Sequence, residues 1–269
     1  MTDDLLTRLE AYYDAVPRRF SQTEECGPFT LFLGEPGGWV YYARPQLGEI
    51  ATVTPAAVVA AVDRLRERGL PQTIEWVHET TPTLLDAVRA TGSFELEELP
   101  LLVLDGDLAV TTPRLPDGVT VRLLGPDDAE AVSAATAASM VGFGAEGTAR
   151  GDAGPAERDA AMKPAKQRVL DLLADGAVRI AVAEQAGHGV VSTGRTLPVG
   201  DVTEVMGVAT LPSARRQGLG AAVTAALVDD ARDLGLRTVF LTASSDDVAR
   251  VYSGIGFQRV GTGWAAERH

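Results

Sequence analysis

The run Arg215-Arg216-Gln217-Gly218-Leu219-Gly220 places two cations and two glycines directly before an amphipathic helix. The first N–H groups of a helix have no intrahelical partner, and the helix dipole adds positive potential there. A glycine carries no Cβ, so a phosphate can approach the main chain closely, and arginine side chains add charged donors. This order of residues predicts a phosphate-binding loop. The alternative is an ordinary turn, since glycine accounts for 28 of the 269 residues.

Two elements must hold this loop in place. Before it, residues 202–210 (VTEVMGVAT) are rich in β-branched and apolar side chains, and Pro212 follows them, which predicts a strand. After it, apolar residues recur at spacings of three and four over 219–234, which predicts a helix. Strands alternate with helices along the rest of the chain, which predicts an α/β fold with a mixed sheet.

Two motifs in this region resemble those of the GNAT acetyltransferase superfamily. The family's pyrophosphate loop reads Arg/Gln-x-x-Gly-x-Gly/Ala, and Arg215, Gly218 and Gly220 match it. Downstream, Tyr252 and Gly256-Phe257 match the family's Tyr-x-x-x-Gly-Phe. The resemblance implies a GNAT-like mixed central sheet flanked by helices, with acetyl-CoA as the co-substrate. The implied cofactor contacts are Val208, Ala209, Thr210, Arg215, Arg216, Gln217, Gly218, Leu219, Gly220 and Ala221.

The resemblance also implies how the thioester of acetyl-CoA is bound and activated. The strand before the loop is expected to splay from its neighbour, so that a backbone N–H near Val208 can stabilise the oxyanion. The family commonly has an asparagine seven residues before its motif tyrosine, where this chain has Ser245. A serine hydroxyl still donates a hydrogen bond but reaches less far, so we expect Ser245 to contact the cofactor with altered affinity.

Two side chains are candidates for proton transfer. Glu204 lies on the predicted strand and by alternation shares a face with Met206 and Val208. Burial among apolar residues would raise the pKa of its carboxyl and suit the family's general base, whereas an exposed, ion-paired Glu204 would be structural. Tyr252 matches the tyrosine that protonates the leaving thiolate, and a core tyrosine is the alternative.

Composition narrows the kinds of site and partner. The chain has one cysteine, Cys26, and three scattered histidines, His78, His188 and His269, so no metal site is expected. A formal net charge of −13 disfavours nucleic acid and polyanions and suits a neutral or cationic amine. No apolar run is long enough to span a membrane, and the acidic N-terminus is unlike a secretory signal. We expect a cytoplasmic protein that does not bind membranes.

The N-terminal half looks like a degenerate copy of the C-terminal one, so the resemblance implies two tandem GNAT-like domains. We place them at 1–110 and 111–269, joined by a turn-rich linker over 105–118. In the first domain Val53-Thr54-Pro55 enters a helix with no glycine loop. We therefore expect that domain to bind no acyl-CoA and to be structural or to form a homodimer.

Residues 141–162 are rich in Gly, Ala and charge and predict a surface loop. The resemblance implies that this segment shapes the acceptor pocket, with residues 141–144 as the contact region. The sequence thus favours an acetyl-CoA-dependent N-acetyltransferase acting on a primary amine of a small molecule. A non-catalytic acyl-CoA-binding or sensing protein is the alternative. A nucleotide-binding module is a weaker one, since the chain lacks Gly-x-x-x-x-Gly-Lys-Ser/Thr.

Overall fold

The computed structural model of the chain describes residues 2–34, 41–48, 52–106, 110–145 and 147–269. It divides into two compact units, each an α/β arrangement with a mixed sheet. Unit 1 comprises Met1–Leu101, Thr242–Asp246 and Arg259–His269, and unit 2 comprises Leu102–Leu241 and Asp247–Gln258. These bounds differ from the expected division after residue 110, because the last strand of the chain joins unit 1.

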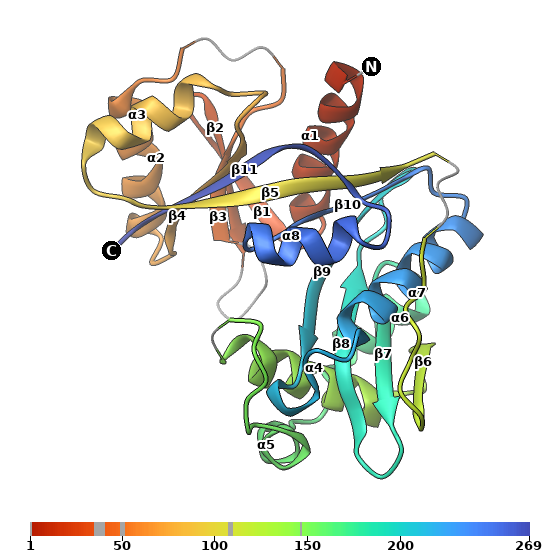
Figure 1. Ribbon diagram of the computed structural model, residues 1–269. Helices are drawn as coiled ribbons and strands as arrows, with labels where there is room; N and C mark the ends of the chain where they lie inside the picture. The colour runs from red at the N-terminus through yellow and green to blue at the C-terminus, as the bar shows by residue number, and fades with distance from the viewer. Residues whose placement is uncertain (1, 35–40, 49–51, 107–109, 146) are drawn as a thin grey trace. The chain divides into compact units, whose positions relative to one another are not determined.

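Unit 1 is built from strands with helices on both faces (Figure 1). In sheet order its strands are β1 (Ser21–Cys26), β2 (Phe29–Gly34), β3 (Tyr41–Pro45), β4 (Gln72–Val77) and β11 (Gln258–Arg268), and then β5 (Glu95–Asp105), which continues into unit 2. Its helices are α1 (Thr2–Arg18), α2 (Pro55–Glu67) and α3 (Thr83–Thr91). The expected hairpin turn at 34–38 falls largely outside the described residues.

The core of unit 1 lies between α2, α3 and one face of the strands. It contains the fully buried Phe29, Leu31, Val58, Leu65, Ile74 and Leu84. Helix α2 begins as the sequence predicts: the Thr54 side chain accepts a hydrogen bond from the Ala57 N–H, and Pro55 occupies the first turn. Gly92 ends α3 in the left-handed conformation.

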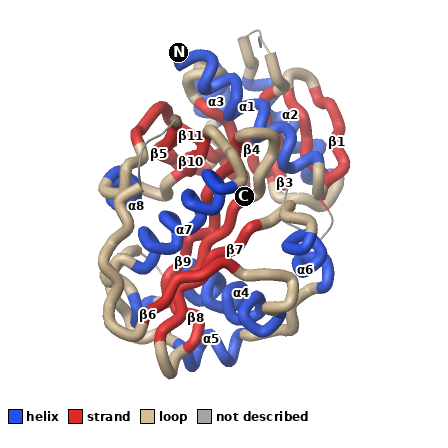
Figure 2. The backbone as a smooth tube through the Cα atoms, turned by 90° about the vertical axis from the view of Figure 1, so that its right-hand side faces the viewer, coloured by secondary structure: helices blue, strands red, loops and turns tan. Residues whose placement is uncertain are grey.

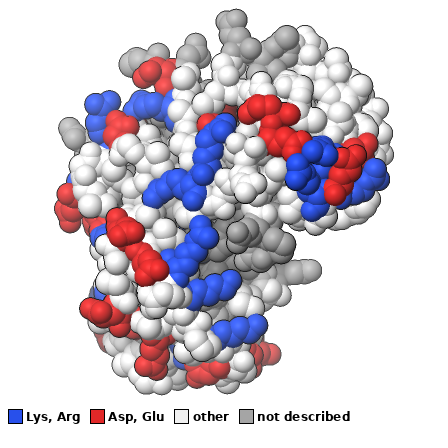
Figure 3. Space-filling view, turned by 180° about the vertical axis from the view of Figure 1, so that it is seen from behind, with Lys and Arg blue, Asp and Glu red and all other residues white. Residues whose placement is uncertain are grey.

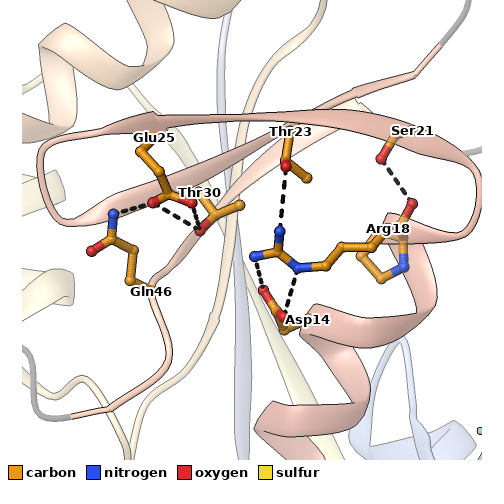
Figure 4. Close-up of polar contacts among 8 residues, drawn as sticks. Asp14, Arg18, Ser21, Thr23, Glu25, Thr30 and Gln46 are labelled. Atoms are coloured by element: carbon orange, nitrogen blue, oxygen red, sulfur yellow. Dashed lines mark hydrogen bonds and ion pairs between the residues drawn. The ribbon is translucent and has the colours of Figure 1, made fainter.

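Helix α1 runs through Pro17, although a proline typically ends a helix. The carbonyl of Pro17 accepts a hydrogen bond from the Ser21 hydroxyl at 2.8 Å, and Arg18 pairs with Asp14 and donates to Thr23 (Figure 4). Figure 4 also shows Glu25 of β1 in contact with Thr30 and Gln46. These bonds fasten the end of α1 to β1, an edge strand whose polar sequence gave no strand signal. The expected apolar stripe of α1 is buried: Leu5, Leu9, Tyr12 and Val16.

The C-terminal residues form a strand, although the sequence gave them no assignment beyond residue 262. Strand β11 pairs antiparallel with β4 from Gly263↔Val77 to Arg268↔Gln72. On this strand Ala266 is fully buried, and Trp264 stacks on Trp76 with ring centroids 6.2 Å apart. The chain therefore returns at its end to complete the sheet of unit 1.

Unit 2 carries the predicted loop and both predicted catalytic residues. Its strands run in the order β10 (Thr238–Thr242), β9 (Val202–Thr210), β8 (Gly189–Thr196), β7 (Arg179–Gln185) and β6 (Val119–Leu123). All neighbours are antiparallel except β9 and β10, which are parallel. The helical elements are α4 (Ala129–Phe143), α5 (Pro155–Ala161), α6 (Gln167–Ala174), the short 3₁₀ turn η1 (Pro212–Ala214), α7 (Leu219–Asp233) and α8 (Asp246–Ser253).

Helices α4 and α7 cover opposite faces of β8 and β9 (Figure 2). Helix α4 begins at Ala129 rather than at Pro126, where a proline would suit the first helical position, because Asp128 accepts from the Gly125 N–H and closes a turn first. The expected loop at 141–162 contains helix α5. Among the described residues, no helix has the length and apolar content needed to cross a membrane.

Candidate active site

Strand β9 parts from its parallel neighbour halfway along its length. Its recorded pairing with β10 covers three positions, from Val202↔Thr238 to Glu204↔Phe240, while β9 continues to Thr210. Within the described part of unit 2, the main chain beyond Glu204 is therefore not paired on the β10 side. This confirms the expected splay and leaves backbone donors and acceptors at an open edge.

A β-bulge lies in the splayed part of β9. Thr193 of β8 opposes Ala209 and Arg195 opposes Met206, so Gly207 and Val208 together oppose Gly194. Gly207 has φ +61°, a conformation that glycine adopts without strain. The extra residue turns the chain, and such bulges re-aim groups beside active sites.

The bulge changes the predicted faces of β9. Val208 packs toward α7: a Cβ added at Gly194 would lie 3.1 Å from both Val208 and Val223 of that helix. Glu204 and Met206 lie on the other face, with Arg195 and Ala209, as the register requires. The prediction that Glu204 shares its face with Met206 is confirmed, and the prediction that Val208 does so is wrong. The extra residue of a bulge moves every later side chain to the opposite face of the sheet, and the sequence of the strand does not show where a bulge lies.

Glu204 is buried, with 8% of its surface exposed, at the last paired position before the splay. Arg195, which the sequence analysis missed, lies on the same face. Its guanidinium covers Gly207: a Cβ there would be 3.2 Å from Nε. Burial lowers the pKa of Arg195. Arg195 is the single charged residue in the sequence of β8, GVVSTGRT, and that was the available signal.

The loop and the first turn of α7 form a cradle against the end of β9. Gly218 precedes α7 with φ +75°, and no side chain caps the helix start. A Cβ added at Gly220 would lie 3.5 Å from Val208 and 3.7 Å from the Thr210 hydroxyl. Since α7 also has no acidic residue in its first turn, its amide groups remain suited to an anion.

The remaining loop residues differ in exposure. Arg216 is exposed and has φ +63°, which makes it the one residue other than glycine with a positive φ among those described. Gln217 is partly buried, and Leu219 and Ala221 are buried on the inner side of α7. Ser245 is exposed and belongs to the stretch 242–246 that clusters with unit 1. Its expected cofactor contact stays a prediction.

The Arg215 side chain is hydrogen-bonded within the protein, and its expected cofactor contact stays a prediction. It donates to three main-chain carbonyls: Gly142 at 2.7 Å, Ala145 at 2.9 Å and Ala149 at 3.2 Å. Gly142 lies in the last turn of α4, and Ala145 and Ala149 lie between α4 and α5. The sequence shows a cation beside glycines, but its partners are 66 to 73 positions away in the chain.

Tyr252 lies on α8, is 8% exposed and packs edge-on against Phe257. Burial raises the pKa of its phenol to about 12, and a hydrogen bond with Thr224 of α7 partly offsets that rise. The Thr224 hydroxyl in turn donates to the Gly220 carbonyl at 2.9 Å. The structure thus links Tyr252 to the glycine loop through one side chain, and at neutral pH its phenol keeps its proton.

Comparison with known proteins agrees with this geometry. Residues 150–257 match the family model described as acetyltransferase (GNAT) family. This part of the chain is therefore similar to a GNAT acetyltransferase domain. The matched segment includes Glu204, the loop at 215–221 and Tyr252. A comparison with curated proteins finds no match.

Solved structures show that the GNAT fold extends over both units. A GCN5-related N-acetyltransferase from Kribbella flavida aligns with a TM-score of 0.71 at 23% identity, covering 98% of this chain and 95% of its own. A tandem GNAT protein from the clavulanic acid biosynthesis pathway aligns with a TM-score of 0.54 at 17% identity, covering 89% and 77%. A conserved protein of unknown function from Staphylococcus epidermidis aligns with a TM-score of 0.58 at 15% identity, covering 92% and 94%. At these identities the likeness is one of fold.

Unit 1 contains a parallel pair as well, β3 and β4, which pair at Ala43↔Ile74. In place of a glycine loop, the capped start of α2 follows β3. Among the described residues, no group of three or more His, Cys, Asp or Glu side chains is arranged to hold a metal ion.

Proposed function

We propose that the protein is an acetyl-CoA-dependent N-acetyltransferase that acetylates a primary amine of a small-molecule acceptor in the cytoplasm. The observation that carries the proposal is the coincidence of three features within the matched segment. Strand β9 splays after Glu204, it bulges at Gly207 and Val208, and it ends against the uncapped start of α7. Together they supply a phosphate cradle and an open strand edge in one continuous stretch.

Each step of acetyl transfer has a candidate group. The N–H groups of residues 218–221 would hold the pyrophosphate, and those of 208–210 the pantetheine arm; bound acetyl-CoA supplies the thioester to be attacked. Glu204 takes the proton from the acceptor ammonium, directly or through water. A main-chain N–H at the bulge donates to the thioester oxygen as it gains negative charge. Tyr252 gives its proton to the leaving sulfur, which requires the neutral phenol that burial maintains.

Acetyl-CoA binding and turnover test the proposal separately. Acetyl-CoA should raise the melting temperature, and thiol release should appear with one or more members of an amine panel. Tyr252→Phe should lower kcat by roughly 10²- to 10⁴-fold while keeping acetyl-CoA binding. Glu204→Gln should do the same. Glu184→Gln, which changes a carboxylate on β7 that accepts a hydrogen bond from Arg122 of β6, should retain activity.

Ser245 favours one alternative, a non-catalytic acyl-CoA sensor with weakened cofactor contacts. Binding of acetyl-CoA without turnover on any amine would support that alternative over the enzyme. For unit 1 we propose a structural role without acyl-CoA, because Thr54 already caps the α2 N–H groups that a phosphate would need. Acidic and basic side chains are interspersed on the face in Figure 3, and the proposal includes no nucleic-acid partner.

A further inference from the structure

The segment between α4 and α5, described at residues 144–145 and 147–154, contacts the turn that follows β9. We call it the α4–α5 connection. Just before it, in the last turn of α4, Gly142 lies close to β9: a Cβ there would lie 3.0 Å from the Ala209 Cβ and 3.2 Å from the Thr210 carbonyl oxygen. Any larger residue would push α4 off the strand. The connection therefore follows a contact with Ala209 and Thr210, the two residues directly after the bulge.

Two sets of hydrogen bonds fasten the connection to the residues just before the glycine loop. The first set comes from Arg215, whose guanidinium donates to the carbonyls of Gly142, Ala145 and Ala149. The Ala145 and Ala149 carbonyls lie in the first half of the connection, and the Gly142 carbonyl lies in the last turn of α4. Charged donors form the stronger hydrogen bonds in proteins, and a planar guanidinium can serve several acceptors at once.

The second set joins the later half of the connection to η1. The Arg150 guanidinium donates to the Ser213 carbonyl at 2.8 Å, and the Gly151 N–H donates to the Pro212 carbonyl at 3.1 Å. In return the Ser213 N–H donates to the Ala153 carbonyl at 2.9 Å. A Cβ at Gly154 would come within 2.6 Å of the Ser213 hydroxyl, so the two chains are in direct contact.

We propose that Arg215 is a positioning residue that couples the α4–α5 connection to the glycine loop, rather than a ligand of the cofactor phosphates. Binding of acetyl-CoA to the loop fixes residues 215–221, and Arg215 transmits that order to residues 142–149. The identity of the ligand rests on the proposed function. By linkage, the opening of the connection and the binding of acetyl-CoA then influence one another through this side chain.

Hydrogen exchange of the full-length protein, with and without acetyl-CoA, tests this assignment. In Arg215→Met, which keeps the apolar stem and removes every donor, residues 142–154 should exchange at least about tenfold faster without ligand, since several charge-assisted hydrogen bonds are lost. Acetyl-CoA should protect these residues in the wild type and no longer do so in the variant. Arg215→Lys should restore part of the protection.

The neighbouring arginine provides a matched control. Arg216→Met removes the same charge from an exposed position, so it should weaken acetyl-CoA binding without changing exchange in the connection. The opposite pattern overturns the proposal: Arg215→Met would then weaken acetyl-CoA binding more than Arg216→Met and leave exchange at 142–154 as in the wild type. If wild-type protein fails to bind acetyl-CoA, the proposed function and the coupling both fall. Faster exchange in unliganded Arg215→Met would still establish the tether.

Discussion

At the scale of single residues, the protonation of Tyr252 makes a testable difference to stability. Its phenol has a pKa of about 12 in the folded chain, against about 10 when unfolded, because burial disfavours the phenolate. Because the folded-state pKa is raised, the neutral phenol adds to the free energy of unfolding. This contribution is complete below a pH of about 10 and is lost as the pH rises toward about 12. The shift corresponds to roughly 3 kcal/mol.

Tyr252→Phe should therefore flatten the alkaline fall in the free energy of unfolding, as measured by urea titration at several pH values. Near neutral pH the variant should lose about 1 kcal/mol with the hydrogen bond to Thr224. An alkaline limb of the same steepness in the variant and the wild type would show that another group governs it.

A second prediction concerns Arg216, which has φ +63° within the glycine loop. The left-handed conformation costs a residue with a Cβ about 1 kcal/mol, and glycine avoids that cost. Arg216→Gly should therefore be more stable than Arg216→Ala by about 1 kcal/mol in urea unfolding. Both variants remove the same charge, so they should weaken acetyl-CoA binding to the same extent. Equal stabilities would show that the loop relaxes around this residue.

Residue types in the loop were readable from the sequence, whereas the partners of the charged side chains were not. The glycines predict the cradle because a missing Cβ has the same consequence wherever the chain goes. Arg215 could equally serve a phosphate or distant carbonyls, and only the fold brings Gly142 and Ala149 to it. Arg195 and Glu204 share a face through register, which no local pattern encodes.

At the scale of elements, the bulge in β9 can be tested with a matched pair of glycines. Gly207 and Gly200 have nearly the same positive φ, +61° and +58°. An added Cβ at Gly200 has no neighbour within 4 Å, whereas at Gly207 it would meet the Arg195 guanidinium. Both alanine variants should lose roughly 1 kcal/mol from backbone strain.

Acetyl transfer should separate these two variants. Gly207→Ala displaces Arg195 and reshapes the bulge, so thiol release should fall at least tenfold, while Gly200→Ala should retain near wild-type turnover. Stability by urea unfolding and activity by thiol release should both be measured on the same preparations. Equal activity in the two variants would remove the bulge from the catalytic site.

How well the sequence predicts a helix or strand depends on the composition and length of that element. Strand β9 was predicted with its observed ends because a run of β-branched residues stops at a proline. Strand β1 was missed because its sequence, SQTEEC, is polar and its burial slight, as suits an edge. Helix α5 was missed because seven residues hold too few turns for a recognisable apolar period.

At the scale of the whole molecule, each unit is built from segments that are not consecutive in the chain. Residues 259–269 lie beyond the glycine loop and Tyr252, yet they complete the sheet of unit 1. The turn-rich stretch over 105–118 predicts a linker, which places these residues in the second domain. The tail GWAAERH has little hydrophobic alternation, and its strand character comes from pairing with β4.

Deletion of residues 259–269 should therefore damage the unit farthest from them in sequence. Unit 1 would lose six pairs between β11 and β4, the stack of Trp264 on Trp76 and the hydrogen bonds from Arg268 to Gln72 at 2.6–2.9 Å. The exposed edge of β4 would also favour aggregation.

After this deletion, hydrogen exchange should rise across β4 and α2, whereas α7 and β8 should stay protected. Trp264→Ala keeps the backbone pairs and removes only a partly buried side chain, so it should raise exchange less than the deletion and cost less than the roughly 3–5 kcal/mol of a fully buried tryptophan. Loss of protection in α7 and β8 instead would show that the tail stabilises unit 2, contrary to the contacts observed.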